Sequence, residues 1–286
     1  MRLDEDYLRE LELWPMFALQ QRAMAKHDSV LPAGHEEPAS VTQSVPVSGA
    51  TYSPSSVTAS VLTVKRPALA NTRPATAAAP VLVDAERAAR IAALDWAGLE
   101  AEAANCTACN LCKQRKQAVL GVGAKNASWL LIGEGPGTDE DLQGEPFVGQ
   151  AGKLLDAMLT AIELKRGREV YIANVVKCRP PGNRTPTAEE SQACAPLLDR
   201  QIELIQPKLM LALGKTAAVR LTQSEASMAS LRGQLHSYTL ESRLIPVVAT
   251  YHPAYLLRNP PDKVKAWEDL LLAKKTMSSL LQLTAA

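Results

Sequence analysis

Apolar positions in this chain form short runs that alternate with segments of helical spacing, and this pattern begins near residue 84. A short apolar run before a turn-forming residue is typical of a buried strand, and apolar positions three and four apart are typical of a helix. Strands are predicted at 129–132, 170–176, 209–213 and 244–249. Helices are predicted at 151–164, at 187–205 behind a capping box, and at 262–281. This alternation predicts an α/β fold of three layers, α/β/α, with a mostly parallel central sheet.

The first 83 residues follow another pattern. Residues 1–29 combine leucines with a Trp-Pro-Met-Phe cluster, which predicts a short helical segment that binds a replication or repair protein. Residues 30–83 are rich in Pro, Ala, Ser, Thr and Val. Such a segment cannot bury enough apolar surface to offset its ordering entropy, so we expect a disordered linker. The folded domain is therefore expected at 84–286.

Charge is uneven along the chain, although the net charge is only +1. Residues 1–100 carry 9 Lys and Arg against 12 Asp and Glu, and the remainder carries 22 against 18. A mildly basic domain behind an acidic arm is compatible with DNA binding. No apolar run reaches membrane-spanning length, and the N-terminus lacks the plan of a signal peptide. We therefore expect a cytoplasmic protein without a membrane partner.

Four of the five cysteines are spaced as metal ligands rather than as a disulfide framework. Cys106 and Cys109 form a C-x2-C pair, and Cys178 and Cys194 follow far downstream. Four thiolates suit either zinc or an iron–sulfur cluster. A zinc ribbon would show a second close pair, so the split spacing favours a [4Fe–4S] cluster, and a fold held by zinc stays the alternative. We treat Cys112 as a neighbour that is not a ligand.

Polar and glycine-rich segments follow the predicted strands, where ligands of parallel sheets bind. The loop 133–137 reads G-E-G-P-G, and the loop 144–149 contains Phe147. Asn174 closes the second strand, and His252 follows the last one. Glycines let backbone N–H groups approach a ligand closely. These segments therefore predict one site at the carboxyl edge of the sheet.

Together these blocks resemble the family 4 uracil-DNA glycosylases, the iron–sulfur branch of the uracil-DNA glycosylase superfamily. The resemblance covers about residues 100–282 and rests on the order of several motifs and on the cysteine spacing. The motifs are G-E-G-P-G at 133–137, N-V-V-K-C-R-P-P-x-N-R at 174–184, L-R-G-x-x-H at 231–236 and H-P-A-Y-L-L-R at 252–258.

The resemblance implies a single α/β/α domain that removes uracil from DNA by hydrolysis, the first step of base excision repair. It also implies a monomer that acts at a bacterial-type nucleoid. One structural [4Fe–4S] cluster would be held by Cys106, Cys109, Cys178 and Cys194. The alternative function is an iron–sulfur module that binds DNA without catalysis, as in related domains fused to phage polymerases.

The resemblance also implies roles within the pocket, which must receive a base flipped out of the duplex. Phe147 would stack on the base, and the amide of Asn174 would distinguish uracil from cytosine. Glu140 would lie near C5 and reject the methyl group of thymine. His252 would stabilise the charge that develops on uracil O2.

The remaining pocket and DNA contacts are assigned by the same resemblance. Gly133, Glu134 and Gly135 would bind the base through the first loop. Glu134, Asp139 and Glu140 stay open as alternatives for activating water, since the best-known branch has an Asp where this chain has Gly135. The expected contacts to DNA are Lys177, Arg179 and Arg184 at phosphates, Arg232 at the backbone, and a wedge ending in Leu256, Leu257 and Arg258.

Overall fold

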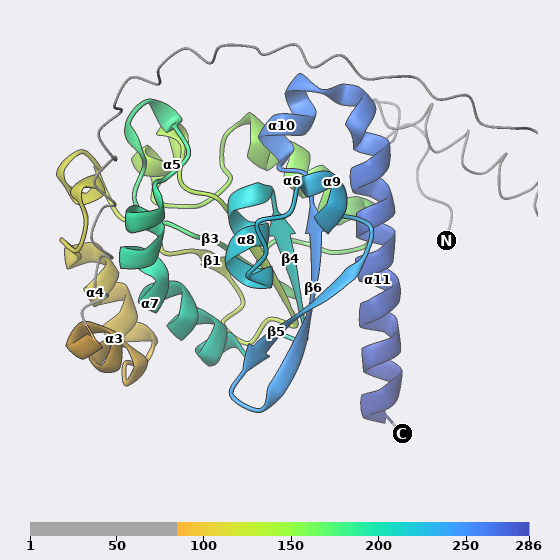
Figure 1. Cartoon of the computed structure of the whole chain (residues 1–286), viewed down its shortest axis with the longest axis horizontal. Coiled ribbons are helices and arrows are strands. Elements are labelled where there is room, and N and C mark those ends of the chain that lie inside the picture. Colours follow the sequence, from red (N-terminus) through yellow and green to blue (C-terminus); the bar gives the residue numbers. More distant parts are fainter. Residues whose placement is uncertain (1–84, 286) are drawn as a thin grey trace, which may run out of the picture. The chain divides into compact units, whose positions relative to one another are not determined.

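The computed structural model describes residues 85–285, so the segments expected at 1–29 and 30–83 lie outside the described residues. The strands are β1 Val122–Gly123, β2 Trp129–Gly133, β3 Val170–Asn174, β4 Leu209–Leu213, β5 Leu235–Leu240 and β6 Arg243–Thr250. They form one sheet in the order β1-β3-β2-β4-β6-β5 (Figure 1). The four central strands are parallel, and both edge strands are antiparallel.

Helices connect the parallel strands and extend the domain at both ends. They are α3 Ala85–Ala92, α4 Trp96–Asn105, α5 Thr138–Gln143, α6 Gln150–Ala161, α7 Ala188–Ile205, α8 Lys215–Thr222, α9 Met228–Leu231, α10 Pro253–Arg258 and α11 Lys263–Ala285. The three predicted helices correspond to α6, α7 and α11. The capping box is confirmed: the Thr187 hydroxyl accepts the Glu190 N–H, and the Glu190 carboxylate accepts the Thr187 N–H.

Alternate strand residues point to opposite faces of the sheet, so the core has two halves. Leu131 and Ile172 pack with α6 and α11, while Leu130 and Ala173 pack with α3, α4, α7 and α8. Every residue of β2, β3 and β4 is buried, as expected for parallel strands covered on both sides. The predicted three-layer α/β/α fold is therefore confirmed.

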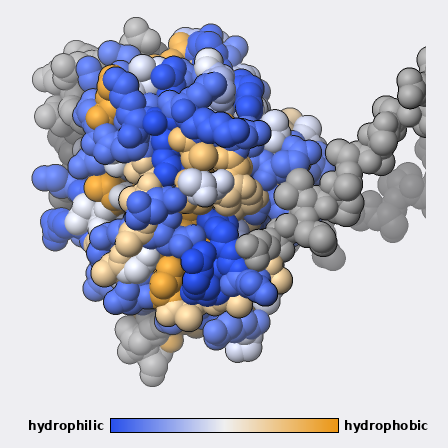
Figure 2. Space-filling view, turned by 90° about the vertical axis from the view of Figure 1, so that its left-hand side faces the viewer, coloured by the Kyte–Doolittle hydropathy of each residue, from blue (hydrophilic) through white to orange (hydrophobic). Residues whose placement is uncertain are grey.

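The edge strand β5 was missed because its sequence alternates exposed and half-buried positions instead of forming an apolar run. The side of the molecule that carries α3 and α4 is mostly hydrophilic, with apolar areas between the hydrophilic residues (Figure 2). Among residues 85–285, no helix has both the length and the apolar composition needed to cross a bilayer.

Candidate active site

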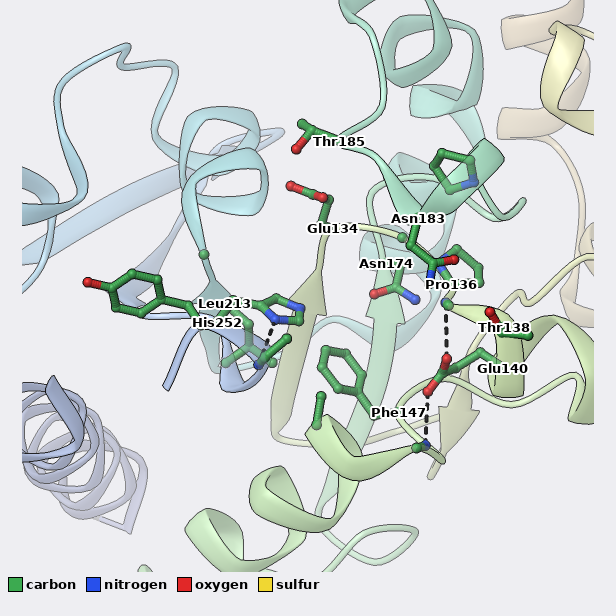
Figure 3. Close-up of a pocket in the computed structure, with 18 of the residues that line it drawn as sticks. Glu134, Pro136, Thr138, Glu140, Phe147, Asn174, Asn183, Thr185, Leu213 and His252 are labelled. Carbon is green, nitrogen blue, oxygen red and sulfur yellow. Dashed lines mark hydrogen bonds between the residues drawn. The ribbon is translucent and has the colours of Figure 1, made fainter. Parts of the chain in front are cut away.

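A cavity of about 550 Å³ opens at the carboxyl edge of the sheet (Figure 3). Each central strand delivers one part of its lining: Glu134 follows β2, Asn174 ends β3, Gly214 follows β4, and His252 follows β6. The loop between α5 and α6 adds Phe147. The structure thus brings together the four segments predicted from the sequence, namely the loops 133–137 and 144–149, Asn174 and His252.

Phe147 and His252 form one wall of this pocket. Their rings are stacked, with centroids 5.4 Å apart and planes inclined by 28°. Gly133 permits this arrangement, because a β-carbon there would lie 2.6 Å from Phe147 Cζ and 2.4 Å from Asn174 Oδ1. Any larger residue at Gly133 would displace both pocket side chains.

Asn174 is 2% exposed, yet its Oδ1 has no hydrogen-bond partner within residues 85–285. A buried acceptor without a donor costs roughly 1–3 kcal/mol. The rest of the residue is well held, because its backbone carbonyl accepts the Lys177 ammonium at 2.7 Å. A buried side-chain acceptor without a partner is typical of a site that awaits a ligand donor.

His252 caps α10, and its Nδ1 accepts the Ala254 N–H at 3.1 Å. Burial lowers the pKa of His252 to about 4, and the positive charge of Arg258 adds to that shift. The imidazole is therefore neutral near pH 7. Since Nδ1 acts as an acceptor, the proton lies on Nε2, which can donate to a ligand.

The three carboxylates near the pocket differ in what they bind. Glu134 lines the pocket and accepts a hydrogen bond from the Thr216 hydroxyl at the start of α8. Glu140 also lines the pocket, but its two oxygens accept three backbone N–H groups. Asp139 lines the pocket as well, from an exposed position on α5. Thr216, three residues after the end of β4, was missed as a residue of the site.

The residues expected at DNA are split by the structure. Arg184 and Arg258 line the pocket, and Arg184 pairs with Glu190 at 2.7 Å. The guanidinium of Arg179 donates to Asn183 at 2.7 Å on the same side. Arg232 lies outside the pocket lining, and its side chain, 14% exposed, pairs with Asp269 of α11.

Two expected DNA contacts are corrected by burial. Lys177 is 1% exposed and points its ammonium at the Asn174 carbonyl, so it does not meet phosphates. Leu256 is 1% exposed and belongs to the core, whereas Leu257 is 43% exposed. Of the two leucines, only Leu257 presents apolar surface to solvent.

All five cysteines line one small cavity between α4, the segment after β3, and α7. Three sulfurs accept hydrogen bonds: Cys106 from Arg87, Cys178 from Arg115 at 3.0 Å, and Cys194 from the Lys177 backbone N–H at 3.3 Å. The Cys109 sulfur also accepts a hydrogen bond from the backbone N–H of Leu111. Donors to sulfur are the usual surroundings of metal-bound thiolates.

Within residues 85–285, no group of three or more His, Cys, Asp or Glu side chains converges as one metal ion would require. A tetrahedral zinc needs four sulfurs at about 2.3 Å from one point. The corners of an iron–sulfur cubane bind separate irons, so its ligands can stand further apart. The five cysteines line one cavity, and four thiolates suit either zinc or an iron–sulfur cluster.

Comparison with known proteins agrees with this geometry. The family model described as "Uracil DNA glycosylase superfamily" matches residues 120–271. The "Type-4 uracil-DNA glycosylase" of Saccharolobus solfataricus is 41% identical over 182 residues, covering 62% of this chain and 84% of that protein. The protein of the same name from Archaeoglobus fulgidus is 44% identical over 163 residues, covering 56% and 81%. A "DNA polymerase" of Bacillus phage SP01 is 30% identical over 170 residues, covering 57% of this chain and 18% of the polymerase.

Proposed function

The chain belongs to the uracil DNA glycosylase superfamily, and we propose that its pocket receives a uracil flipped out of DNA and supports hydrolysis of the N-glycosidic bond. The chain is a DNA-repair glycosylase that excises uracil, in line with type-4 relatives at 41–44% identity. The observation that carries the assignment to this pocket is the buried Asn174 Oδ1, which lacks a partner within the described residues.

Uracil recognition follows from the amide of Asn174. Its oxygen can accept N3–H of uracil while its amino group donates to O4. Cytosine has an acceptor at N3 and donors at C4, so the same amide would leave buried groups unpaired, at roughly 1–3 kcal/mol each. The Phe147 ring, 6% exposed, supplies the face on which the base stacks.

Departure of the base leaves negative charge on uracil O2. The neutral His252 can donate its Nε2 proton as a hydrogen bond to that oxygen, since Nδ1 is already occupied by Ala254. One such donor contributes roughly 3–4 kcal/mol in other enzymes. A neutral donor suits this role, because it stabilises the oxygen without giving up its proton.

Glu134 is the carboxylate we assign to the attacking water. Thr216 holds one of its oxygens, while the oxygens of Glu140 are occupied by backbone N–H groups. Glu134 therefore keeps acceptor capacity for a water molecule at the pocket wall. The role of Glu140 against the thymine methyl stays a prediction.

DNA would approach across the rim that holds Arg184 and Arg258, with Arg179 beside it. Guanidinium groups at such a rim neutralise phosphates and fix the register of the strand. Leu257, exposed on α10, would fill the space that the flipped nucleotide leaves. The proposal includes a monomer that acts at the nucleoid, and the partner-binding role of 1–29 stays a prediction.

Cys106, Cys109, Cys178 and Cys194 would hold a [4Fe–4S] cluster, which supplies a covalent cross-link between three separate segments. These segments are the loop after α4, the segment after β3, and the first turns of α7. Asn174 and Cys178 lie on the same short segment. Holding the cysteines therefore also holds the exit of β3 at the pocket.

The proposal is tested with pure protein and oligonucleotides that carry uracil in single- and double-stranded form. Abasic sites, detected as alkali-labile breaks, should form from uracil, while matched thymine and cytosine oligonucleotides stay intact. Absence of abasic sites at stoichiometric protein would overturn the proposal. It would instead favour the non-catalytic DNA-binding module, for which the match to a phage polymerase speaks.

A further inference from the structure

The stacking residue Phe147 has an unusual backbone. Its φ of 57° lies in the left-handed region, which a residue with a β-carbon adopts reluctantly. Such a conformation persists only where the surrounding structure imposes it, and it tends to occur at functional sites. The groups that impose it therefore decide where the ring points.

Arg166 holds this turn from behind. It lies between α6 and β3, outside the lining of the pocket. Its Nη1 donates to the Pro146 carbonyl and its Nη2 donates to the Phe147 carbonyl, both at 2.8 Å. Its Nε donates to Asp156 of α6 at 2.9 Å. A planar guanidinium thus joins two consecutive carbonyls to a fixed helix, as a lysine cannot.

The other side of the turn is held by Glu140. One carboxylate oxygen accepts the N–H groups of Val148 and Gly149 at 2.9 and 3.1 Å. Helix α6 closes the arrangement at Gly152, where a β-carbon would lie 1.8 Å from the Phe147 carbonyl oxygen. The peptide groups before and after Phe147 are therefore both fixed.

We propose that Arg166 is a positioning residue for base recognition: together with Glu140 it holds Phe147 in the left-handed conformation that turns its ring toward the base. This inference rests on the proposed function, because it assumes that the ring stacks on uracil. It assigns a role in the reaction to a side chain that touches neither base nor DNA. It also assigns Glu140 a positioning role through its backbone contacts.

The test uses Arg166→Ala with Arg168→Ala as its matched control. Arg168 lies two residues away, and its side chain, 77% exposed, pairs with the neighbouring Glu169 within residues 85–285. Arg166→Ala should lower kcat/KM on uracil-containing DNA about tenfold, within the range of one base–aromatic stack. Its affinity for DNA that already carries an abasic site should not change, because that ligand has no base. Arg168→Ala should match the wild type in both measurements.

A double-variant cycle separates positioning from general loosening. If Arg166 acts through Phe147, then Arg166→Ala should cost nothing further in a Phe147→Ala background. Arg166→Lys should retain only part of the activity, because its ammonium lacks the planar fork that spaces the three contacts of the guanidinium. Should Arg166→Ala fail to fold, Asp156→Asn is the second variant, because it weakens the ion pair that holds the Arg166 guanidinium. The Asp156 side chain is 51% exposed. The same non-additivity with Phe147→Ala is expected.

Two outcomes would overturn the inference while leaving the glycosylase activity standing. One is an Arg166→Ala enzyme as active as Arg168→Ala. The other is a loss that adds in full to that of Phe147→Ala. A wild-type protein that forms no abasic sites would instead refute the proposed function, so the two failures are distinguishable.

Discussion

The pocket and the cysteine cavity lie at the two ends of the segment 174–178. Their polar groups differ in whether they have hydrogen-bond partners. Asn174, where β3 ends, keeps a buried oxygen without a partner among the described residues. Four residues on, the Cys178 sulfur accepts a hydrogen bond from Arg115, and Lys177 between them donates its backbone N–H to Cys194. The pocket leaves an acceptor open for a ligand that comes and goes. The cysteine cavity instead surrounds its sulfurs with donors, which suits a permanent group.

The largest effect is expected from replacing a cysteine that lines the cysteine cavity. Cys194 is 7% exposed, and burial raises the pKa of its free thiol to about 12. Binding as a metal ligand requires the thiolate. Cys194→Ser should lose iron and visible absorbance, and its thermal midpoint should fall sharply. Structural metal sites contribute on the order of 10 kcal/mol to folding. A colourless wild-type protein with stoichiometric zinc would contradict the cluster assignment.

His252→Ala should impair catalysis in the pocket and leave the cysteine cavity unchanged. It removes the donor to uracil O2, so kcat should fall about 10²–10³-fold. Iron content should equal that of the wild type, because His252 belongs to the pocket and not to the cysteine cavity. Single-turnover cleavage measures the first expectation, and an iron assay on the same preparation measures the second. Loss of iron in this variant would show that the two regions are not separable.

Asn174→Asp tests whether the amide of Asn174 distinguishes uracil from cytosine. A carboxylate still accepts N3–H but cannot donate to O4, so discrimination against cytosine should weaken. The expected loss on uracil is about 1–3 kcal/mol for one unpaired buried group. Competition between uracil and cytosine oligonucleotides measures the change in ratio. An unchanged ratio would mean that another group reads the base.

The pocket residues could be predicted from the sequence because the carboxyl ends of parallel strands meet at one edge of a sheet. Asn174 and His252 each directly follow or end a recognisable apolar run. The same rule would have indicated Thr216, which comes just after β4. No comparable local signal exists for Arg166, whose partners are backbone carbonyls brought near only by folding.

The two misassigned DNA contacts, Leu256 and Lys177, and the unforeseen ion pair of Arg232 share one physical cause. Helix α10 has six residues, too few for a periodic pattern to show that Leu256 is buried and Leu257 exposed. Arg232 meets its partner Asp269 on a distant helix, so its pairing is invisible to local sequence. Lys177 lies beside exposed arginines in sequence but turns inward to the Asn174 carbonyl. In each case the side chain's direction depends on tertiary packing.

The dependence of stability on pH tests the protonation state of His252, and the expected effect is smaller. The folded pKa of His252, about 4, lies below the unfolded value of about 6.5. Between these values the unfolded chain binds more protons than the folded one, so stability falls as pH drops from 6.5 toward 4. The expected contribution is about 1–3 kcal/mol. Thermal unfolding of wild type and His252→Gln should differ in this acid slope, and parallel slopes would contradict a neutral buried imidazole.

The smallest effect should come from Cys112, which lines the same cavity as the four assigned ligands. A cubane takes four thiolates, and hydrogen-bond donors act on the sulfurs of Cys106, Cys178 and Cys194 and on Cys109. Cys112→Ala should therefore keep its iron, its colour and its thermal midpoint. Cys109→Ala is the matched control, since it lies one turn away and should lose all three. Loss of iron from Cys112→Ala with retention in Cys109→Ala would exchange the two assignments, and would place the cluster against the short helix Asn110–Lys113.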